Sequence, residues 1–432
     1  MKHPFQGRKK NDPAQENTDS SEQSFAHKLG SFFNPEPQKE KVLRHEDFTA
    51  AGDPYYATVS AGYKIAGRVL WLFFVVFMVF SIATNYKEIT YDNFFYLIKD
   101  FTSAADAGNN TYETLSYESD SRQTFTLYRG GVATVSPSRL SIFTATGRRT
   151  LRESSGFSSP YAISSDQYLL IYDTSGTTFS IYNSFARVYN KTLDYPITDA
   201  CLGSDGSFAI VTRSADSRSV IRTYDKRFKE LREINADYYV FDIQINAKEN
   251  LLSFLYYDAG NGTGRTVLSV RAFDTLEQID SVAFEGEFPL GCGYLENNRF
   301  AVVTDRCIRI LDDVLETVEL SDDYWNGTIT GFSIDEEGVA VCATEASKNY
   351  VFAFDKSGSL LYNDTVDAAV SDIAVCGGYL FLQTEGGITR LDPSTEIREE
   401  LPTGYGKMLI YNENTALVCG ESKAEYLIFK NH

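Results

Sequence analysis

Histidine is nearly absent from this chain, and its placement excludes several kinds of chemistry. Of 432 residues only four are histidine: three lie before residue 46 and the fourth is the last residue. The long region between them therefore has no imidazole. Serine–histidine and cysteine–histidine nucleophiles, and metal sites built on imidazole, are excluded from that region.

Positive charge is also scarce. Forty Lys and Arg against 59 Asp and Glu give a net charge of −19, and after residue 68 the balance is 30 against 50. Nucleic-acid binding needs a basic surface, so the composition excludes nucleic acid as a partner. Proline (11) and methionine (3) are few, whereas tyrosine (28) and phenylalanine (30) are abundant, which favours strands.

The cysteines are few and scattered, with no CxxC pair and no metal-ligand spacing. Each lies in an apolar, strand-like run, where cysteine usually serves as a small buried hydrophobe. A chain this long needs no disulfides to fold. We therefore expect buried thiols, no metal site and no cofactor. The six residues are Cys201, Cys292, Cys307, Cys342, Cys376 and Cys419.

One run has no charge at all. Val69–Thr84 reads VLWLFFVVFMVFSIAT, and with the residues just before it the run reaches about 20 residues, enough to cross a hydrocarbon core. We expect a transmembrane helix at 65–85. More than sixty residues precede this helix, which favours a retained signal anchor over a cleaved signal peptide.

The residues around this run predict its orientation and its neighbours. Lys64 and Arg68 precede it, and a single Lys beside a Glu follows it, so the positive-inside bias places the N-terminus in the cytoplasm. Residues 1–61 are rich in polar and charged residues, and we expect a disordered cytoplasmic tail. After the run, Asp92 can cap an apolar stripe of helical spacing, which predicts a juxtamembrane helix at 92–106.

Residues 111–432 repeat with a period of about forty residues. A run that is apolar at successive positions, as in a strand buried on both faces, recurs eight times. The runs are 131–138, 168–174, 208–214, 251–258, 300–306, 339–345, 379–385 and 416–422. Each is followed by a second apolar strand that ends at a turn residue, most often Asp or Asn, whose side chain can bond the next backbone amides. Four short strands per unit predict an all-β protein, a β-propeller of eight blades, or seven if the outermost units merge.

The last unit has only three candidate strands before the chain ends. A fourth candidate lies far upstream, because Thr111–Glu118 precedes the first unit, which begins at Thr124. We predict that this strand pairs with the one containing Tyr426–Phe429. The ring would then be closed by the two ends of the domain.

The turns YDKRFKEL (224–231) and FDKSGSLL (354–361) resemble those of quinoprotein-like and YVTN-type propellers. The WD dipeptide and the tryptophan-docking glycines of quinone-cofactor repeats are absent. The order of tail, span and aromatic-rich propeller is similar to that of an uncharacterised family of single-pass membrane proteins from Gram-positive Clostridia and their relatives. The resemblance implies an architecture and a location, the cell membrane with the propeller extracytoplasmic.

Carboxylates are the remaining candidates for chemistry. A pair of them for glycoside hydrolysis stays open as an alternative. Asp258–Gly264 (DAGNGTG) and Asp322–Asp323 carry oxygen ligands suited to calcium, but they lack the alternation of an EF-hand loop, so we interpret them as turns. Gly203–Gly206 (GSDG) resembles the Asp-box turn of sialidase-like propellers, but it occurs once and has no following Trp.

These observations predict a membrane-anchored, non-enzymatic binding or scaffold module with a protein, peptide or glycan on the propeller face. They assign no catalytic, metal-binding or cofactor-binding residue. The alternative is an extracytoplasmic enzyme that uses carboxylates or a bound cofactor in the central channel. Inward carboxylates or aromatics at one channel mouth would favour the enzyme, and a broad exposed aromatic patch would favour partner binding.

Overall fold

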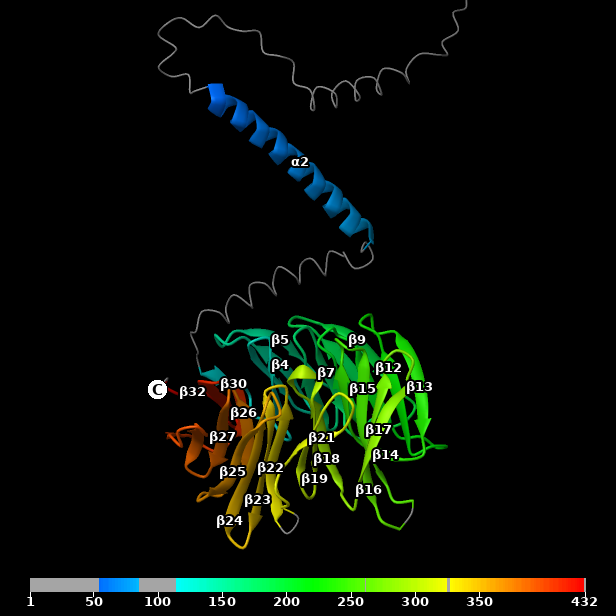
Figure 1. Cartoon of the computed structure of the whole chain (residues 1–432), viewed down its shortest axis with the longest axis vertical. Helices are drawn as coiled ribbons and strands as arrows, with labels where there is room; N and C mark the ends of the chain where they lie inside the picture. The colour runs from blue at the N-terminus through cyan, green and yellow to red at the C-terminus, as the bar shows by residue number, and fades with distance from the viewer. Residues whose placement is uncertain (1–53, 85–113, 261, 325–326, 431–432) are drawn as a thin grey trace, which may run out of the picture. The chain divides into compact units, whose positions relative to one another are not determined.

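The computed structural model describes residues 54–84, 114–260, 262–324 and 327–430 (Figure 1). They belong to two compact parts that divide near residue 90, and each part is considered by itself. Most of the expected tail and the whole expected juxtamembrane helix at 92–106 lie outside the described residues.

The first part is one helix, α2 (Pro54–Thr84), which begins within the expected tail and covers the expected span up to residue 84. Its described side chains are Tyr63 and 65–80. Five successive side chains at 70–74 (Leu, Trp, Leu, Phe, Phe) are all exposed, and at 3.6 residues per turn they point to every side of the helix. Among the residues that the structure describes, no helix combines the length and the apolar character that crossing a membrane requires.

The second part is an eight-bladed β-propeller, as predicted. Its strands form eight antiparallel sheets of four strands each. Blades 1 to 4 consist of β2 (Thr124–Tyr128), β3 (Gly131–Val135), β4 (Leu140–Phe143) and β5 (Arg149–Glu153); β6 (Pro160–Ser164), β7 (Leu169–Asp173), β8 (Thr178–Tyr182) and β9 (Arg187–Thr192); β10 (Ile197–Leu202), β11 (Phe208–Thr212), β12 (Ser219–Tyr224) and β13 (Glu230–Ala236); and β14 (Tyr239–Asn246), β15 (Leu251–Asp258), β16 (Arg265–Ala272) and β17 (Gln278–Glu285).

Blades 5 to 7 follow the same order, and blade 5 has a short 3-10 helix, η2 (Glu296–Asn298), after its first strand. Their strands are β18 (Pro289–Tyr294), β19 (Phe300–Thr304), β20 (Ile308–Leu311) and β21 (Thr317–Leu320); β22 (Thr328–Asp335), β23 (Gly338–Glu345), β24 (Lys348–Asp355) and β25 (Leu360–Val366); and β26 (Asp372–Cys376), β27 (Tyr379–Thr384), β28 (Gly387–Leu391) and β29 (Arg398–Pro402). Blade 8 combines β30 (Lys407–Asn412), β31 (Thr415–Cys419) and β32 (Lys423–Ile428) with β1 (Leu115–Ser116).

Burial follows the position of a strand in its blade. The second strands are the apolar runs of the sequence, and β3, β11, β19 and β31 are buried at every position. The apolar clusters join neighbouring blades, since Val303 of blade 5 packs with Val341 of blade 6. The fourth strand β21 is exposed throughout. First strands of neighbouring blades lie next to one another and line the central channel.

The turns before the fourth strands are held as the sequence predicted. In blade 3, the Asp225 carboxylate accepts hydrogen bonds from the amides of Arg227 and Lys229, both at 2.9 Å. In blade 6, Asp355 accepts from the amides of Ser357 (2.8 Å) and Ser359 (3.0 Å). Each carboxylate thus satisfies amides that have no strand partner, and it stabilises the turn.

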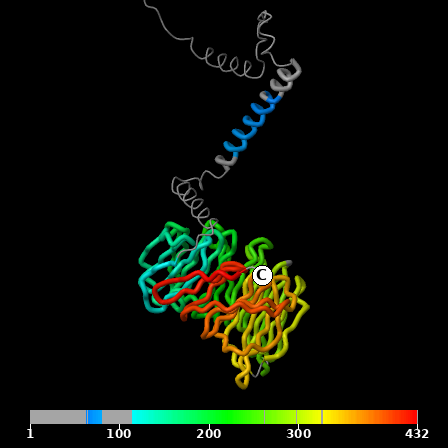
Figure 2. Tube along the Cα trace, turned by 90° about the vertical axis from the view of Figure 1, so that its left-hand side faces the viewer, coloured from blue at the N-terminus to red at the C-terminus, as the bar shows by residue number. Residues whose placement is uncertain are grey.

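The predicted ring closure is confirmed. β1 pairs with β32, Leu115 opposite Ala424 and Ser116 opposite Lys423, and it supplies the fourth strand of blade 8. The strand is shorter than the predicted Thr111–Glu118. Figure 2 shows this cyan start of the propeller beside its red end. Beyond the strand, the Tyr117 hydroxyl donates to the Gly420 carbonyl at 2.7 Å.

The up-and-down order of strands gives the propeller two different faces. The face on which first strands begin also carries the turns between second and third strands, and we call it the entry face. The opposite face carries the turns between first and second strands and between third and fourth strands, and we call it the turn face.

Candidate functional site: the entry face and the channel

Among the residues of the propeller that the structure describes, the exposed aromatic side chains belong to first strands or to the loops that lead into them. They are Tyr161, Tyr195, Tyr239, Phe241, Phe288, Phe332 and Tyr405. Exposed aliphatic side chains lie elsewhere, at fourth strands and the turns before them, or at the end of β32. Most of the exposed aromatic surface is therefore on the entry face and around the channel mouth.

Two of these rings form a packed cluster with the half-buried Tyr257 between blades 4 and 5. Phe241 and Phe288 meet edge to face with centroids 5.0 Å apart, and Tyr257 lies 5.1 Å from Phe288. The Phe288 amide donates to the Asp305 carboxylate at 2.7 Å, which fixes the loop that carries the ring. Because neighbouring rings and a hydrogen bond hold Phe288 in place, the cluster loses little conformational entropy when a partner covers it.

A cavity of about 1180 Å³ opens at the channel mouth beside blades 1, 2, 7 and 8. Tyr405, 97 % exposed, and Tyr161 supply aromatic surface. The Asp372 carboxylate forms an ion pair with the Lys407 ammonium group at 2.6 Å, between the neighbouring first strands β26 and β30. Asp120 accepts hydrogen bonds from the Ser136 hydroxyl at 2.6 Å and from the Ser138 hydroxyl, and these lower the pKa of Asp120 to about 2. The cavity thus joins aromatic rings to an Asp120 carboxylate that stays ionised at neutral pH.

Two further carboxylates lie deeper in the channel wall. Asp199 of β10 and Asp242 of β14 each follow a β-bulge in a first strand, and a bulge turns a side chain away from the regular alternation. Asp242 accepts a hydrogen bond from the Cys292 amide of the next blade at 2.7 Å. Asp199 accepts from the Ala200 amide at 2.9 Å and from the Tyr172 hydroxyl at 3.4 Å. The pair therefore also links blades 2 to 5.

Burial raises the pKa of Asp199 well above its usual value, and the nearby charge of Asp242 raises it further. Burial likewise raises the pKa of Asp242, against the amide of Cys292, which lowers it. Two half-buried carboxylates side by side do not both ionise readily. Among the described residues, this pair most resembles an acid–base site in the channel.

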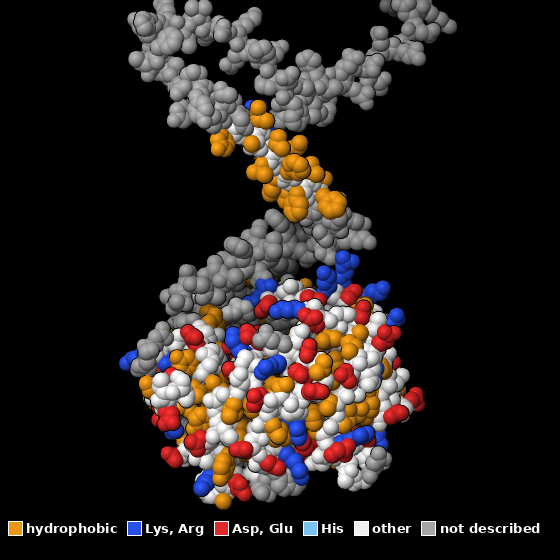
Figure 3. Space-filling model, viewed as in Figure 1, with side chains coloured by type: hydrophobic (Ala, Val, Ile, Leu, Met, Phe, Trp, Pro, Cys, Tyr) orange, Lys and Arg blue, Asp and Glu red, His pale blue; other side chains and the backbone are white. Residues whose placement is uncertain are grey.

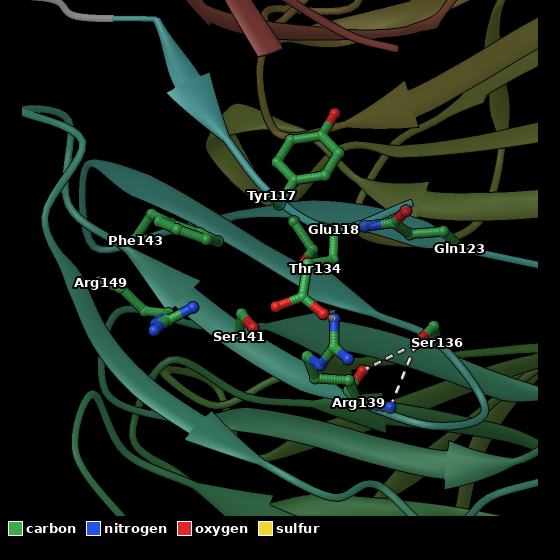
Figure 4. A pocket seen from close by; sticks show the side chains of 9 residues that line it. All are labelled: Tyr117, Glu118, Gln123, Thr134, Ser136, Arg139, Ser141, Phe143 and Arg149. Atoms are coloured by element: carbon green, nitrogen blue, oxygen red, sulfur yellow. Dashed lines mark hydrogen bonds and ion pairs between the residues drawn. The ribbon is translucent and has the colours of Figure 1, made fainter. Parts of the chain in front are cut away.

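A third feature, the small pocket of Figure 4, lies where β1 meets blade 1. The Glu118 carboxylate forms ion pairs with Arg139 at 2.7 Å and Arg152 at 2.8 Å. The pocket holds about 10 Å³, room for a single water. It is part of the ring closure and too small for an organic ligand.

The two calcium candidates are turns with other partners. Asp258 forms hydrogen bonds to both the Nε (3.0 Å) and the Nη2 (2.8 Å) of Arg265. Asp322 accepts from the Asn363 amide nitrogen at 2.8 Å beside a cavity of about 390 Å³. No three His, Cys, Asp or Glu side chains of the described residues are grouped to hold a metal ion.

The other sequence candidates also have local structural roles. Gly203–Gly206 is a turn in which Asp205 accepts from the amide and hydroxyl of Ser207. All six cysteines are free, and five are buried. The Asp199–Asp242 pair was missed, although a signal existed: an Asp inside an otherwise apolar strand, as in ITDACL and YVFDIQ.

The fold and its faces define a β-propeller with an aromatic entry face. The chain belongs to the family of unknown function DUF5711, whose model matches residues 107–424. No curated protein matches it.

Several solved structures share the fold at low identity. The computationally designed Ika8 protein is 13 % identical, with a TM-score of 0.56, over 73 % of this chain and 100 % of Ika8. The Dos1 propeller is 13 % identical, with a TM-score of 0.51, over 76 % and 97 %. BamB from Moraxella catarrhalis is 9 % identical, with a TM-score of 0.50, over 74 % and 99 %. At these identities the likeness shows the fold alone.

Proposed function

We propose that the protein is a non-enzymatic binding module whose entry face holds a protein or peptide partner. The observation that carries this proposal is the gathering of exposed aromatic side chains on that face, away from the outer strands. Aromatic anchors dominate the binding energy of protein interfaces, and a rigid ring such as Phe288 is suited to that role. A glycan stacked on Tyr405 at the channel mouth is the other ligand that this surface suits.

We further propose that residues 65–85 hold the propeller at the cell membrane, with the propeller on the extracytoplasmic side. The described side chains at 69–80 of α2 are apolar on every side, and leaving them in water costs about 1.5–3 kcal/mol for each large one. The charge-free run continues beyond these side chains to Thr84, and together they approach the length of a span.

The alternative, an enzyme that uses the channel carboxylates, is favoured by two observations: the Asp199–Asp242 pair, and the channel-mouth cavity in which Tyr161 and Tyr405 lie with Asp120 and Asp372. The hydrogen bonds of Asp199 and Asp242 argue against an enzymatic function. Asp242 accepts from the Cys292 amide of the next blade, and Asp199 accepts from the Ala200 amide of its own strand, so both carboxylates already have hydrogen-bond partners within the fold. We therefore place this function second.

The test is site-specific photo-crosslinking of the full chain in its native cells. A photoreactive phenylalanine analogue is placed at Phe288, and for comparison at Leu360, which is similarly exposed but lies on the outer strand β25. We expect a discrete adduct from Phe288 that disappears when Phe241→Ala is added. Equal adducts from both positions, or none from Phe288, would overturn the proposal.

A further inference from the structure

Charge is divided unevenly around the ring. Residues 114–236, which hold β1 and blades 1 to 3, have 15 Lys and Arg against 12 Asp and Glu. Residues 237–432, which hold blades 4 to 8, have 13 against 33. One arc of the propeller is therefore slightly positive, while the rest has a net charge of −20.

The division is sharpest in the turns between third and fourth strands, all of which lie on the turn face. In blades 1 to 3 these turns and the residues that border them contain six cations and two carboxylates. They are Arg148, Arg149, Arg187, Lys226, Arg227, Lys229, the turn-holding Asp225 and Glu230. In the view of Figure 3, Lys and Arg side chains gather along the rim where β5, β9 and β13 lie.

The matching turns of blades 4 to 7 have the opposite sign. They contain eight carboxylates and two cations: Asp274, Glu277, Asp312, Asp313, Glu316, Asp355, Lys356, Asp392, Glu396 and Arg398. The turns between first and second strands, on the same face, add one net negative charge to blades 1 to 3 and three to blades 4 to 8. They leave the contrast intact.

We propose that the turn face binds the turn face of a second copy of this chain, the basic arc of each copy against the acidic arc of the other. The two-fold axis would lie in the plane of the interface and pass across blades 4 and 8. Blades 1, 2 and 3 of one copy then lie opposite blades 7, 6 and 5 of the other. Lys226 and Lys229 of one copy then meet Asp313 and Glu316 of the other, and the same contact occurs twice. A surface complementary to itself in this way is what a two-fold dimer requires.

The same charges disfavour an anionic lipid surface as the occupant. A membrane that approached the basic arc would also meet the acidic arc, since both lie on one face. Residues 114–432 together have 28 Lys and Arg against 45 Asp and Glu, so the whole domain is repelled by negative charge. A second copy satisfies both arcs at once.

The experiment follows self-association of the purified full chain in detergent by analytical ultracentrifugation. Because exposed charges are screened, we expect self-association to weaken at least about ten-fold between roughly 50 and 500 mM salt. Two paired variants test the register: Lys226→Glu with Lys229→Glu, and Asp313→Lys with Glu316→Lys. All four side chains are exposed. Each pair alone should weaken association about ten-fold or more, whereas an equimolar mixture of the two variants should recover it.

The matched control is Arg213→Glu with Lys348→Glu, an equal change of charge at two exposed positions on the entry face. It should leave association unchanged. A chain that stays monomeric at low salt would overturn the proposal. Association that is insensitive to salt and to both variants would also overturn it, because the contact would then lie elsewhere. If the control variant weakened self-association equally, net charge in general would be the cause, and the proposed contact between turn faces would be wrong.

Discussion

At the scale of single residues, Asp199 and Asp242 are the least expected feature of the molecule. Each is an ionisable group in a first strand, and the carboxylate of each accepts a hydrogen bond from a backbone amide. Burial raises the pKa of both, so the folded state favours the protonated form. A group of this kind stabilises the fold below its unfolded pKa, and this contribution is lost as pH rises through the folded pKa.

Asp199→Asn should therefore stabilise the propeller at neutral pH and have little effect near pH 4. The amide oxygen can still accept from Ala200 and Tyr172, and no charge has to be buried. We expect a melting temperature higher by about 1–2 °C at pH 7.5, the shift that about 1 kcal/mol produces in a domain of roughly 300 residues. Thermal unfolding from pH 4 to 8 measures it.

The control is Asp205→Asn, the same substitution at an exposed position in a turn of blade 3. A lower melting temperature for Asp199→Asn at pH 7.5 would show that the carboxylate is ionised and needed for stability. An enzyme that used the pair would lose its activity in this variant while the fold became more stable.

At the scale of elements, the short strand β1 closes the ring. Leu115 is 1 % exposed and packs with Val132 of blade 1 and Leu417 of blade 8. Tyr117 and Glu118 then tie the chain to blade 8 and blade 1. A strand of two residues can do this because Leu115 is buried and the two residues that follow the strand are fixed by a hydrogen bond and by ion pairs.

Leu115→Ala in the full chain should lower the free energy of unfolding by about 2–4 kcal/mol, the usual cost of a cavity at a buried leucine. Leu360→Ala, at an exposed position of β25, should change it by no more than about 0.5 kcal/mol. Denaturant unfolding of both variants gives the comparison. Equal stability of the two would mean that β1 does not contribute to the closed ring.

At the scale of the whole molecule, the orientation of the chain decides which compartment the entry face meets. A cysteine at Ser20 in the N-terminal tail should resist membrane-impermeant thiol reagents in intact cells, whereas one at the exposed Lys348 should react. Five of the six native thiols are buried, which keeps the background low. Labelling at Ser20 with protection at Lys348 would reverse the orientation.

The sequence by itself was enough to predict the number of blades and the ring closure. Strands buried on both faces must be apolar at successive positions, and β3, β11 and β19 show that pattern directly. Turn carboxylates such as Asp225 act on amides two and four residues away, so their role is also local. The missing strand of blade 8 followed from counting, because a propeller leaves no long edge unpaired.

Only the tertiary structure decided which side chains share a surface. Asp199 and Asp242 are 43 positions apart and meet because neighbouring first strands lie side by side. Phe241 and Phe288 form one aromatic cluster for the same reason. A residue within an apolar run can face either the channel or the neighbouring blade. Bulges and the packing of sheets decide which, and both depend on contacts between blades. The local pattern of residues therefore determined the blades, and the packing of the ring determined the sites.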